Sequence, residues 1–303
     1  MPERKVLFGA SLGQWNGADV GNTAGVLELA TQADRDGLDL FTMADHPYFG
    51  EKLDAYATLA FLLGRTSNIA GAVTVTNLPC RPAPVLARAV TSLSALSGGR
   101  VVLGLGAGGL WDEIVKLGVP RLTPGAAVEA LEEAITVVRA LSGGGEPVHF
   151  GGAVYQVSGV TPAPVAAPPV WTGSVGPKSL AVTGKLADGW MPSRASDWLS
   201  PVYREGRPVI DEAAAAAGRK PEEIATIYNF GGRITAEPLR ETRDGDGRWI
   251  GGSAQQWVAE MTGAVLEHGA SGFVYRATDD TPPAEALHRW ALDVVPAVRE
   301  ALG

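Results

Sequence analysis

The chain has 303 residues, of which 46% are hydrophobic and 19% are charged, an ordinary balance for a globular protein. Its 25 basic and 33 acidic side chains give a net charge of −8, which argues against a nucleic-acid or membrane-surface partner, because both need basic patches. The single cysteine, Cys80, excludes an internal disulfide framework.

Neither a targeting segment nor a membrane span is expected. The apolar stretch at residues 6–10 is short and reads as a first strand rather than as a signal peptide. No run of about 18 apolar residues occurs anywhere, so a transmembrane helix is not predicted. We therefore expect a cytoplasmic protein.

Short apolar runs alternate with longer amphipathic runs along the chain. The first four predicted strands, each with the helix that follows it, are residues 6–12 and 23–36, 38–43 and 55–66, 69–75 and 82–96, and 101–105 and 125–141. Residues 148–157 then predict a small inserted hairpin. The last four pairs are residues 170–173 and 177–186, 189–192 and 203–217, 224–234 and 254–267, and 272–275 and 284–302.

Eight strand–helix units predict a TIM (β/α)8 barrel with a hairpin inserted before the fifth strand, in one domain over residues 1–303. The alternative is an open doubly wound sheet. Such a sheet usually carries a G-x-G-x-x-G fingerprint after its first strand, and the sequence LGQWNG at residues 12–17 does not fit it. We therefore favour the barrel.

In a barrel of this kind, functional residues lie on the loops after the strands. The rule selects the following candidates in chain order: Trp15 and Asn16, residues 45–48, Thr76, Asn77 and Arg81, residues 106–113, residues 174–176, Ser193 and Arg194, residues 229–233, and Arg276.

Among the four histidines, only His46 is a candidate by this rule. Beside Asp45 it could carry a proton, since its unperturbed pKa is near neutrality, or it could be a hydrogen-bonded structural histidine. We expect no metal, because no second histidine or cysteine stands at ligand spacing. A serine nucleophile has weak support, because Ser174 lacks the G-x-S-x-G spacing.

Two glycine-rich loops follow strands, at residues 104–109 and 173–177. The second opens a helix, so its backbone N–H groups could bind a phosphate with help from Ser174 and Lys178. The alternative is that both are tight turns that need glycine. Several aromatic residues near the mouth could wall a flat ring or simply pack the rim: Trp15, Tyr48, Phe49 and Trp111. Few acid–base groups and several aromatic faces suit a site in which a flat cofactor carries the chemistry.

Five segments, in the same order and over nearly the whole chain, resemble the bacterial-luciferase-like superfamily. They are residues 43–46 (MADH), residues 76–87 (TN followed by R, AP and LA), residues 96–108 (LSGGRVVLGLGAG), residues 186–190 (LADGW) and residues 250–253 (IGGS). The resemblance implies a TIM barrel with an insertion. It also implies either FMN, in monooxygenases, or the deazaflavin coenzyme F420, in hydride-transfer enzymes.

The pattern Thr76-Asn77 with Arg81 is closer to the deazaflavin branch, which includes methylenetetrahydromethanopterin reductase and glucose-6-phosphate dehydrogenase. In that branch a cis non-proline peptide backs the cofactor ring, and alignment on Arg81 places it between Thr74 and Val75.

The resemblance also implies the site residues. His46 would face the reactive ring beside Asp45, and Asn77 would lie by the cofactor. The remaining cofactor contacts implied are Trp15, Thr74, Val75, the ring-edge turn of Gly106, Ala107 and Gly108, and the phosphate loop of Gly173, Ser174, Val175 and Gly176.

One position departs from the pattern. The sugar-phosphate dehydrogenases of the branch have an acidic proton donor directly after the glycine turn, where this chain has Gly109. Asp112 and Glu113 follow one helical turn later. We predict Glu113 as the replacement, and the alternative is that both acids only cap the next segment.

The leading hypothesis is a coenzyme F420-dependent oxidoreductase that moves a hydride between the deazaflavin and a small organic substrate. The second is an FMN-dependent monooxygenase supplied by a flavin reductase, and the third is a non-catalytic flavin-binding barrel. By resemblance we expect a homodimer, and a flavin or F420 reductase is a candidate partner. The loops at residues 50–54, 194–201 and 237–250 carry no code for the substrate, and residues 240–248 are either a mobile lid or a solvated loop.

Overall fold

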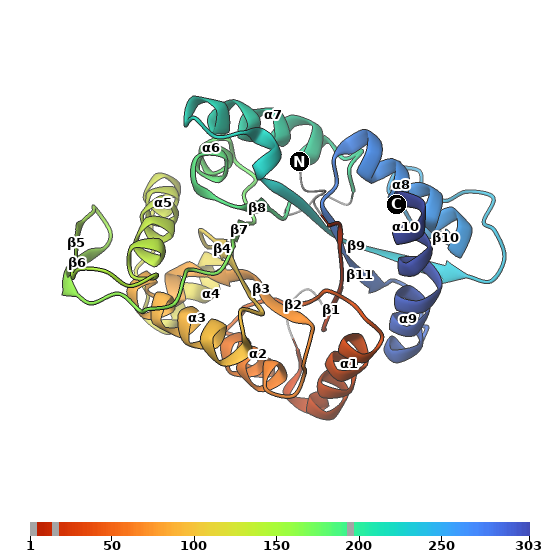
Figure 1. Ribbon diagram of the computed structural model, residues 1–303, viewed down its shortest axis with the longest axis horizontal. Helices are drawn as coiled ribbons and strands as arrows, with labels where there is room; N and C mark the ends of the chain where they lie inside the picture. The colour runs from red at the N-terminus through yellow and green to blue at the C-terminus, as the bar shows by residue number, and fades with distance from the viewer. Residues whose placement is uncertain (1–4, 14–17, 193–196) are drawn as a thin grey trace.

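Eight parallel strands close into a barrel in the computed structural model, which describes residues 5–13, 18–192 and 197–303 (Figure 1). Pairing of β9 with both β8 and β11 completes the ring. In order around it, the strands are β1 (Leu7–Ser11), β2 (Leu40–Met43), β3 (Ala70–Asn77), β4 (Val101–Gly106), β7 (Val170–Thr172), β8 (Gly189–Trp190), β9 (Ala225–Thr235) and β11 (Gly272–Ala277). The predicted TIM barrel is confirmed.

Helices surround the strands as an outer ring (Figure 1). They are α1 (Thr23–Arg35), α2 (Ala55–Leu63), α3 (Ala83–Ser97), α4 (Trp111–Ile114), α5 (Pro124–Ala140), α6 (Pro177–Leu186), α7 (Pro201–Ala216), α8 (Ala254–His268), α9 (Pro283–Arg289) and α10 (Val295–Leu302). No helix among the described residues is both long and apolar enough to cross a membrane.

Side chains from alternate strand positions pack on the inner and outer sides of the barrel wall, because successive residues of a strand point to opposite faces. The barrel interior is packed by Leu40, Ala72, Trp171, Met191, Ala225, Ile227 and Val274. The positions between them in the strands point outward and pack against the helices. They include Phe8, Phe41, Tyr228, Phe230 and Phe273. The interior is therefore closed mainly by apolar packing.

The predicted hairpin is present as β5 (Val148–Gly151) and β6 (Gln156–Val160), which pair antiparallel before β7. A further short strand, β10 (Gly251–Ser253), extends the sheet beside β9. The C-terminal helix predicted as one element is divided by a π turn at Trp290–Val294. Pro296 lies in the first turn of α10, where it has no N–H to continue the ladder of hydrogen bonds.

The segment at residues 236–250 is fastened to the loop after β8. The buried carboxylate of Asp197 accepts hydrogen bonds from Arg243 Nη1 at 2.7 Å and from the Trp249 N–H at 3.1 Å. Arg243 also pairs with Glu260 on α8. The sequence offered two interpretations of residues 240–248, a mobile lid or a solvated loop. The structure instead holds this stretch in place through the ion pairs of Arg243 with the buried Asp197 and with Glu260.

Candidate active site

A buried ion pair joins the loops after β2 and β3. Asp45 is 2% exposed, and its Oδ1 and Oδ2 accept hydrogen bonds from Arg81 Nη2 at 2.6 Å and Arg81 Nε at 2.7 Å. Oδ2 also accepts from the Asn77 N–H at 2.9 Å. Three charge-assisted hydrogen bonds therefore satisfy this carboxylate and fix the backbone at the end of β3.

Arg81 reaches a second carboxylate at the start of α2. Its Nη2 donates to Asp54 Oδ2 at 2.7 Å, and its guanidinium lies 4.8 Å from the centroid of the Tyr56 ring. Burial raises the pKa of Asp54, but the hydrogen bonds from Arg81 and from N–H groups of α2 outweigh it and hold that pKa below its usual value. One side chain, that of Arg81, thus connects the loop after β2, the loop after β3 and the start of α2.

The peptide bond between Thr74 and Val75 is cis, at the position that the resemblance implied. The register of β3 against β4 shifts between Val73 and Thr76, so the strand bulges there. A Cβ at Gly106 would lie 2.5 Å from Val75 Cγ2, and one at Gly173 would lie 3.1 Å from Val75 Cγ1. The Val75 side chain therefore occupies space that the ends of β4 and β7 leave open only because they carry glycine.

His46 takes part in a chain of side-chain hydrogen bonds. Its Nδ1 lies 2.6 Å from the Tyr48 hydroxyl, and Asn77 Nδ2 donates to the same hydroxyl at 3.3 Å. Tyr48 can donate its own proton to His46 Nδ1 while it accepts from Asn77, and in that arrangement the imidazole proton lies on Nε2. Phe49 packs against both rings, with centroids 5.8 Å from His46 and 4.9 Å from Tyr48.

Tyr48 remains a neutral phenol at physiological pH. Burial raises its pKa to about 12, and the negative charges of Asp45 and Glu113 push in the same direction. The sequence suggested Tyr48 only as an aromatic wall. Its place two residues after a strand-end histidine was the signal that could have marked it as a hydrogen-bonding partner.

Two buried oxygen atoms near the mouth have no hydrogen-bond partner within the described part of the chain: Asn77 Oδ1 and Thr42 Oγ1. Thr42 occupies the same face of β2 as Leu40, which packs the barrel interior. A buried acceptor without a partner is costly, so such atoms commonly mark a place where a ligand or water completes the bonding. No sequence pattern pointed to Thr42.

The turn after β7 leads into α6 without a side-chain cap at Gly176. Ser174 is buried beneath the turn, where its hydroxyl accepts a hydrogen bond from Thr183 Oγ1 at 3.0 Å and its carbonyl accepts from Trp190 Nε1. Val175 and Lys178 are exposed. An anion at this turn would therefore meet backbone N–H groups and Lys178 before the Ser174 side chain.

The acidic residues after the glycine turn are already paired. Glu113 accepts two hydrogen bonds from Lys116 Nζ, at 2.7 and 2.8 Å, and Asp112 pairs with Arg121. Gly108, at φ +98°, lets the chain turn over Pro79 and Trp111. Glu113 is close enough to influence Tyr48, but its role as a proton donor stays a prediction.

Trp15, Asn16, Ser193 and Arg194 fall outside the described residues. Burial raises the pKa of Cys80, as does the Asp45 carboxylate, so this thiol is protonated near neutral pH. Among the described residues, no group of three histidine, cysteine, aspartate or glutamate side chains is placed to hold a metal ion.

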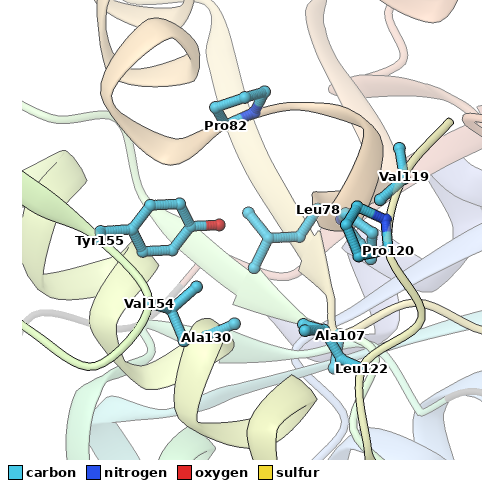
Figure 2. A pocket seen from close by; sticks show the side chains of 10 residues that line it. Leu78, Pro82, Ala107, Val119, Pro120, Leu122, Ala130, Val154 and Tyr155 are labelled. Carbon is cyan, nitrogen blue, oxygen red and sulfur yellow. The ribbon is translucent and has the colours of Figure 1, made fainter.

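An apolar cavity of about 190 Å³ lies next to the turn at Ala107 (Figure 2). Leu78 and Pro79 contribute from the loop after β3, while Val154 and Tyr155 contribute from the hairpin. The ring of Tyr155 points into the cavity (Figure 2). The inserted hairpin thus covers the outer side of the loops that carry the candidate site.

A parallel α/β barrel whose ion pair, imidazole and glycine turns all gather at the carboxyl ends of its strands has the architecture of a barrel enzyme. The chain belongs to the luciferase-like monooxygenase family, whose sequence model matches residues 4–284. It is therefore an oxidoreductase of the luciferase-like class.

Two curated relatives are F420-dependent glucose-6-phosphate dehydrogenases. The one from Microbacterium testaceum is 28% identical over 72% of this chain, and the match spans 66% of that protein, just under two thirds. The one from Nakamurella multipartita is 28% identical over 87% of this chain and 77% of its own length. Among solved structures, an F420-dependent secondary alcohol dehydrogenase in complex with an F420–acetone adduct superposes with a TM-score of 0.79. It shares 20% identity, with 97% of this chain and 99% of that one covered.

Proposed function

We propose that this protein is a coenzyme F420-dependent oxidoreductase that moves a hydride between the deazaflavin and a small organic substrate. The observation that carries the proposal is the cradle at the barrel mouth, which consists of Val75 in the bulge of β3, Gly106 at the end of β4 and Gly173 after β7. His46 is linked to the end of β3 through Tyr48 and Asn77. The two curated relatives, both named as F420-dependent enzymes, supply the choice of cofactor.

The residues present suit a flat ring with a phosphorylated tail. Val75 packs against Gly106 and Gly173, and a larger side chain at either glycine would collide with Val75 and displace it. Asn77 Oδ1 is a buried acceptor that a ring N–H would satisfy. The uncapped start of α6 at Gly176 offers N–H groups to a phosphate.

The bound deazaflavin would supply the two-electron hydride chemistry, and the protein would orient the reactants and manage the accompanying proton. His46, whose Nδ1 is engaged by Tyr48, would carry or stabilise that proton. Asp45 and Arg81 do not reach His46 through a described hydrogen bond, and they hold the loop that carries it.

FMN is the second candidate cofactor. The family is named for monooxygenases, and the same cradle would accept the ring of FMN. That route inserts oxygen and needs a reductase partner to supply reduced flavin. A barrel that binds a flavin without turnover is the third candidate, since Gly109 stands where the sugar-phosphate dehydrogenases carry their acid.

The decisive experiment titrates the purified protein with F420 and with FMN, following ring fluorescence. We expect micromolar binding of F420, weakened at least tenfold by Gly106→Ala, because the new Cβ would meet Val75 Cγ2 at 2.5 Å. Gly109→Ala is the matched control, since nothing lies within 4 Å of a Cβ there. Binding of FMN without F420 would favour the second candidate. F420 that binds but stays redox-inert across a substrate panel would favour the third.

A further inference from the structure

The apolar cavity of about 190 Å³ beneath the inserted hairpin lies on the helix side of the barrel wall (Figure 2). Leu78 and Ala130, which line it, pack in one cluster with Leu103 and Leu105 of β4. Because side chains alternate along a strand, Gly106 and the cradle lie on the opposite side of β4 from these leucines. The cavity is therefore separate from the barrel mouth.

The lining of this cavity is almost entirely apolar. None of the lining residues, all of which are among those the structure describes, carries a charge. The polar side-chain group is the hydroxyl of Tyr155, whose ring points into the cavity (Figure 2). Burial raises the pKa of this phenol, so it stays neutral at physiological pH. A charged ligand would lose its water here without gaining a partner, so the lining favours an uncharged one.

The hairpin wall of the cavity is held by a single carboxylate. Glu133 on α5 accepts hydrogen bonds from three successive N–H groups of the hairpin turn, those of residues 153–155, at 2.6, 3.0 and 2.8 Å. Gly152 leaves room for this contact, because a Cβ there would lie 2.3 Å from Glu133 Cδ. Val154 and Tyr155 are therefore presented to the cavity from a turn whose backbone is fixed.

The other walls also resist collapse. Three of the lining residues are prolines, Pro79, Pro82 and Pro120, whose rings restrict the backbone. An empty apolar cavity is costly, because its lining atoms lose van der Waals partners, and a flexible wall would relax into the space. A clamped hairpin and three prolines instead keep it open. An apolar cavity of about 150 Å³ accommodates a benzene ring, so this one has room for a slightly larger molecule.

We propose that this cavity is a second ligand site, which binds a compact, uncharged molecule built on a single ring or a short branched chain. The ligand would lie against the outer side of the turn at Ala107, and the Tyr155 hydroxyl could meet one polar atom of it. Pro79 joins this wall to the glycine turn, since a Cβ at Gly108 would lie 2.8 Å from Pro79 Cγ. Binding here does not depend on which cofactor occupies the cradle.

The test titrates toluene into the protein without cofactor and follows the side-chain methyl groups by NMR. We expect saturable shifts at Leu78, Val119 and Leu122, with a dissociation constant at or below about 1 mM. Benzoate, which adds a charge to the same ring, should bind about tenfold more weakly or worse. Leu266, which is 72% exposed on α8, is the internal reference and should not shift.

Two variants of the hairpin locate the binding. Val154→Phe puts a larger ring into the cavity and should weaken toluene binding about tenfold or more. Val160→Phe is the matched control, because Val160 is similarly exposed on the same hairpin but does not line the cavity, and it should bind as the wild type does. Ala130→Leu fills the space from α5 and replaces the first variant if circular dichroism shows that Val154→Phe is unfolded.

Three results would overturn the site. They are toluene shifts that reach Leu266 as strongly as the cavity methyls, equal affinity in the wild type and a folded cavity-filling variant, and benzoate binding as tight as that of toluene. Since the titration contains neither F420 nor FMN, its failure and a failure of the cofactor experiment are separate results.

Discussion

At the scale of single residues, the contact between His46 Nδ1 and the Tyr48 hydroxyl sets the chemistry of the site. We expect Tyr48→Phe to remove the donor that favours the Nε2–H tautomer. A neutral hydrogen bond contributes about 1 kcal/mol, so the tautomer ratio should change roughly fivefold. ¹⁵N NMR of the His46 ring measures that ratio, and the rate of hydride transfer should fall by a similar factor.

The variant Phe49→Leu separates this hydrogen bond from ring packing. Phe49 contacts the same imidazole, with ring centroids 5.8 Å apart, but it offers no donor. It should therefore leave the ¹⁵N shifts of His46 near those of the wild type. If Tyr48→Phe also leaves them unchanged, another group sets the tautomer and Tyr48 is only a wall of the pocket.

At the scale of elements, Arg81 binds the loop after β2 to the start of α2. We expect Arg81→Ala to lower the free energy of unfolding by about 3–5 kcal/mol. The reason is that the Asp45 carboxylate, which is 2% exposed, would remain buried without its cation. Urea unfolding measures the loss. Arg88→Ala on α3 is the control and should change stability by less than about 0.5 kcal/mol, since this exposed arginine forms no ion pair among the described residues. A loss under about 1 kcal/mol for Arg81→Ala would mean that water reaches Asp45.

The elements were also the level at which the sequence was most informative. Alternating apolar runs located all eight strands and the inserted hairpin, because burial on both faces of a parallel strand leaves a continuous apolar signal. The division of the last helix was missed, although Pro296 was visible within it. The pattern of apolar residues continues across a π turn, so periodicity alone cannot show it.

The site was predictable only in part. The barrel rule selected His46, Asp45, Asn77 and Arg81 from their places after strands, but not which of them pair. That Asp45 bonds to Arg81 rather than to His46 depends on the bulge and register of β3, which no local pattern encodes. Thr42 was missed because a threonine inside an apolar strand reads as a strand residue.

At the scale of the whole molecule, many aromatic side chains lie in the layer between the barrel and its helices. Stacked and edge-on contacts run from Trp198 through Tyr228 and Phe273. A second group joins Tyr275, Trp257 and Trp290. Burial there raises the pKa of Tyr228 and Tyr275, and burial elsewhere raises that of the remaining four tyrosines, Tyr48, Tyr56, Tyr155 and Tyr203. All six tyrosines of the chain are thus harder to ionise in the folded state.

This burial predicts that the fold weakens in alkali. In the unfolded chain the phenols lose their protons near pH 10, whereas the folded protein keeps them to higher pH, with Tyr48 near 12. Between these values the unfolded state binds fewer protons, so the free energy of unfolding must fall as pH rises through 10. Each unit of raised pKa corresponds to about 1.4 kcal/mol once the window has been crossed. Urea unfolding at pH 8 and pH 10.5, with phenolate absorbance at 295 nm recorded on the folded protein, measures both effects. Phenolate absorbance that appears near pH 10 without unfolding would show that the tyrosines are open to water.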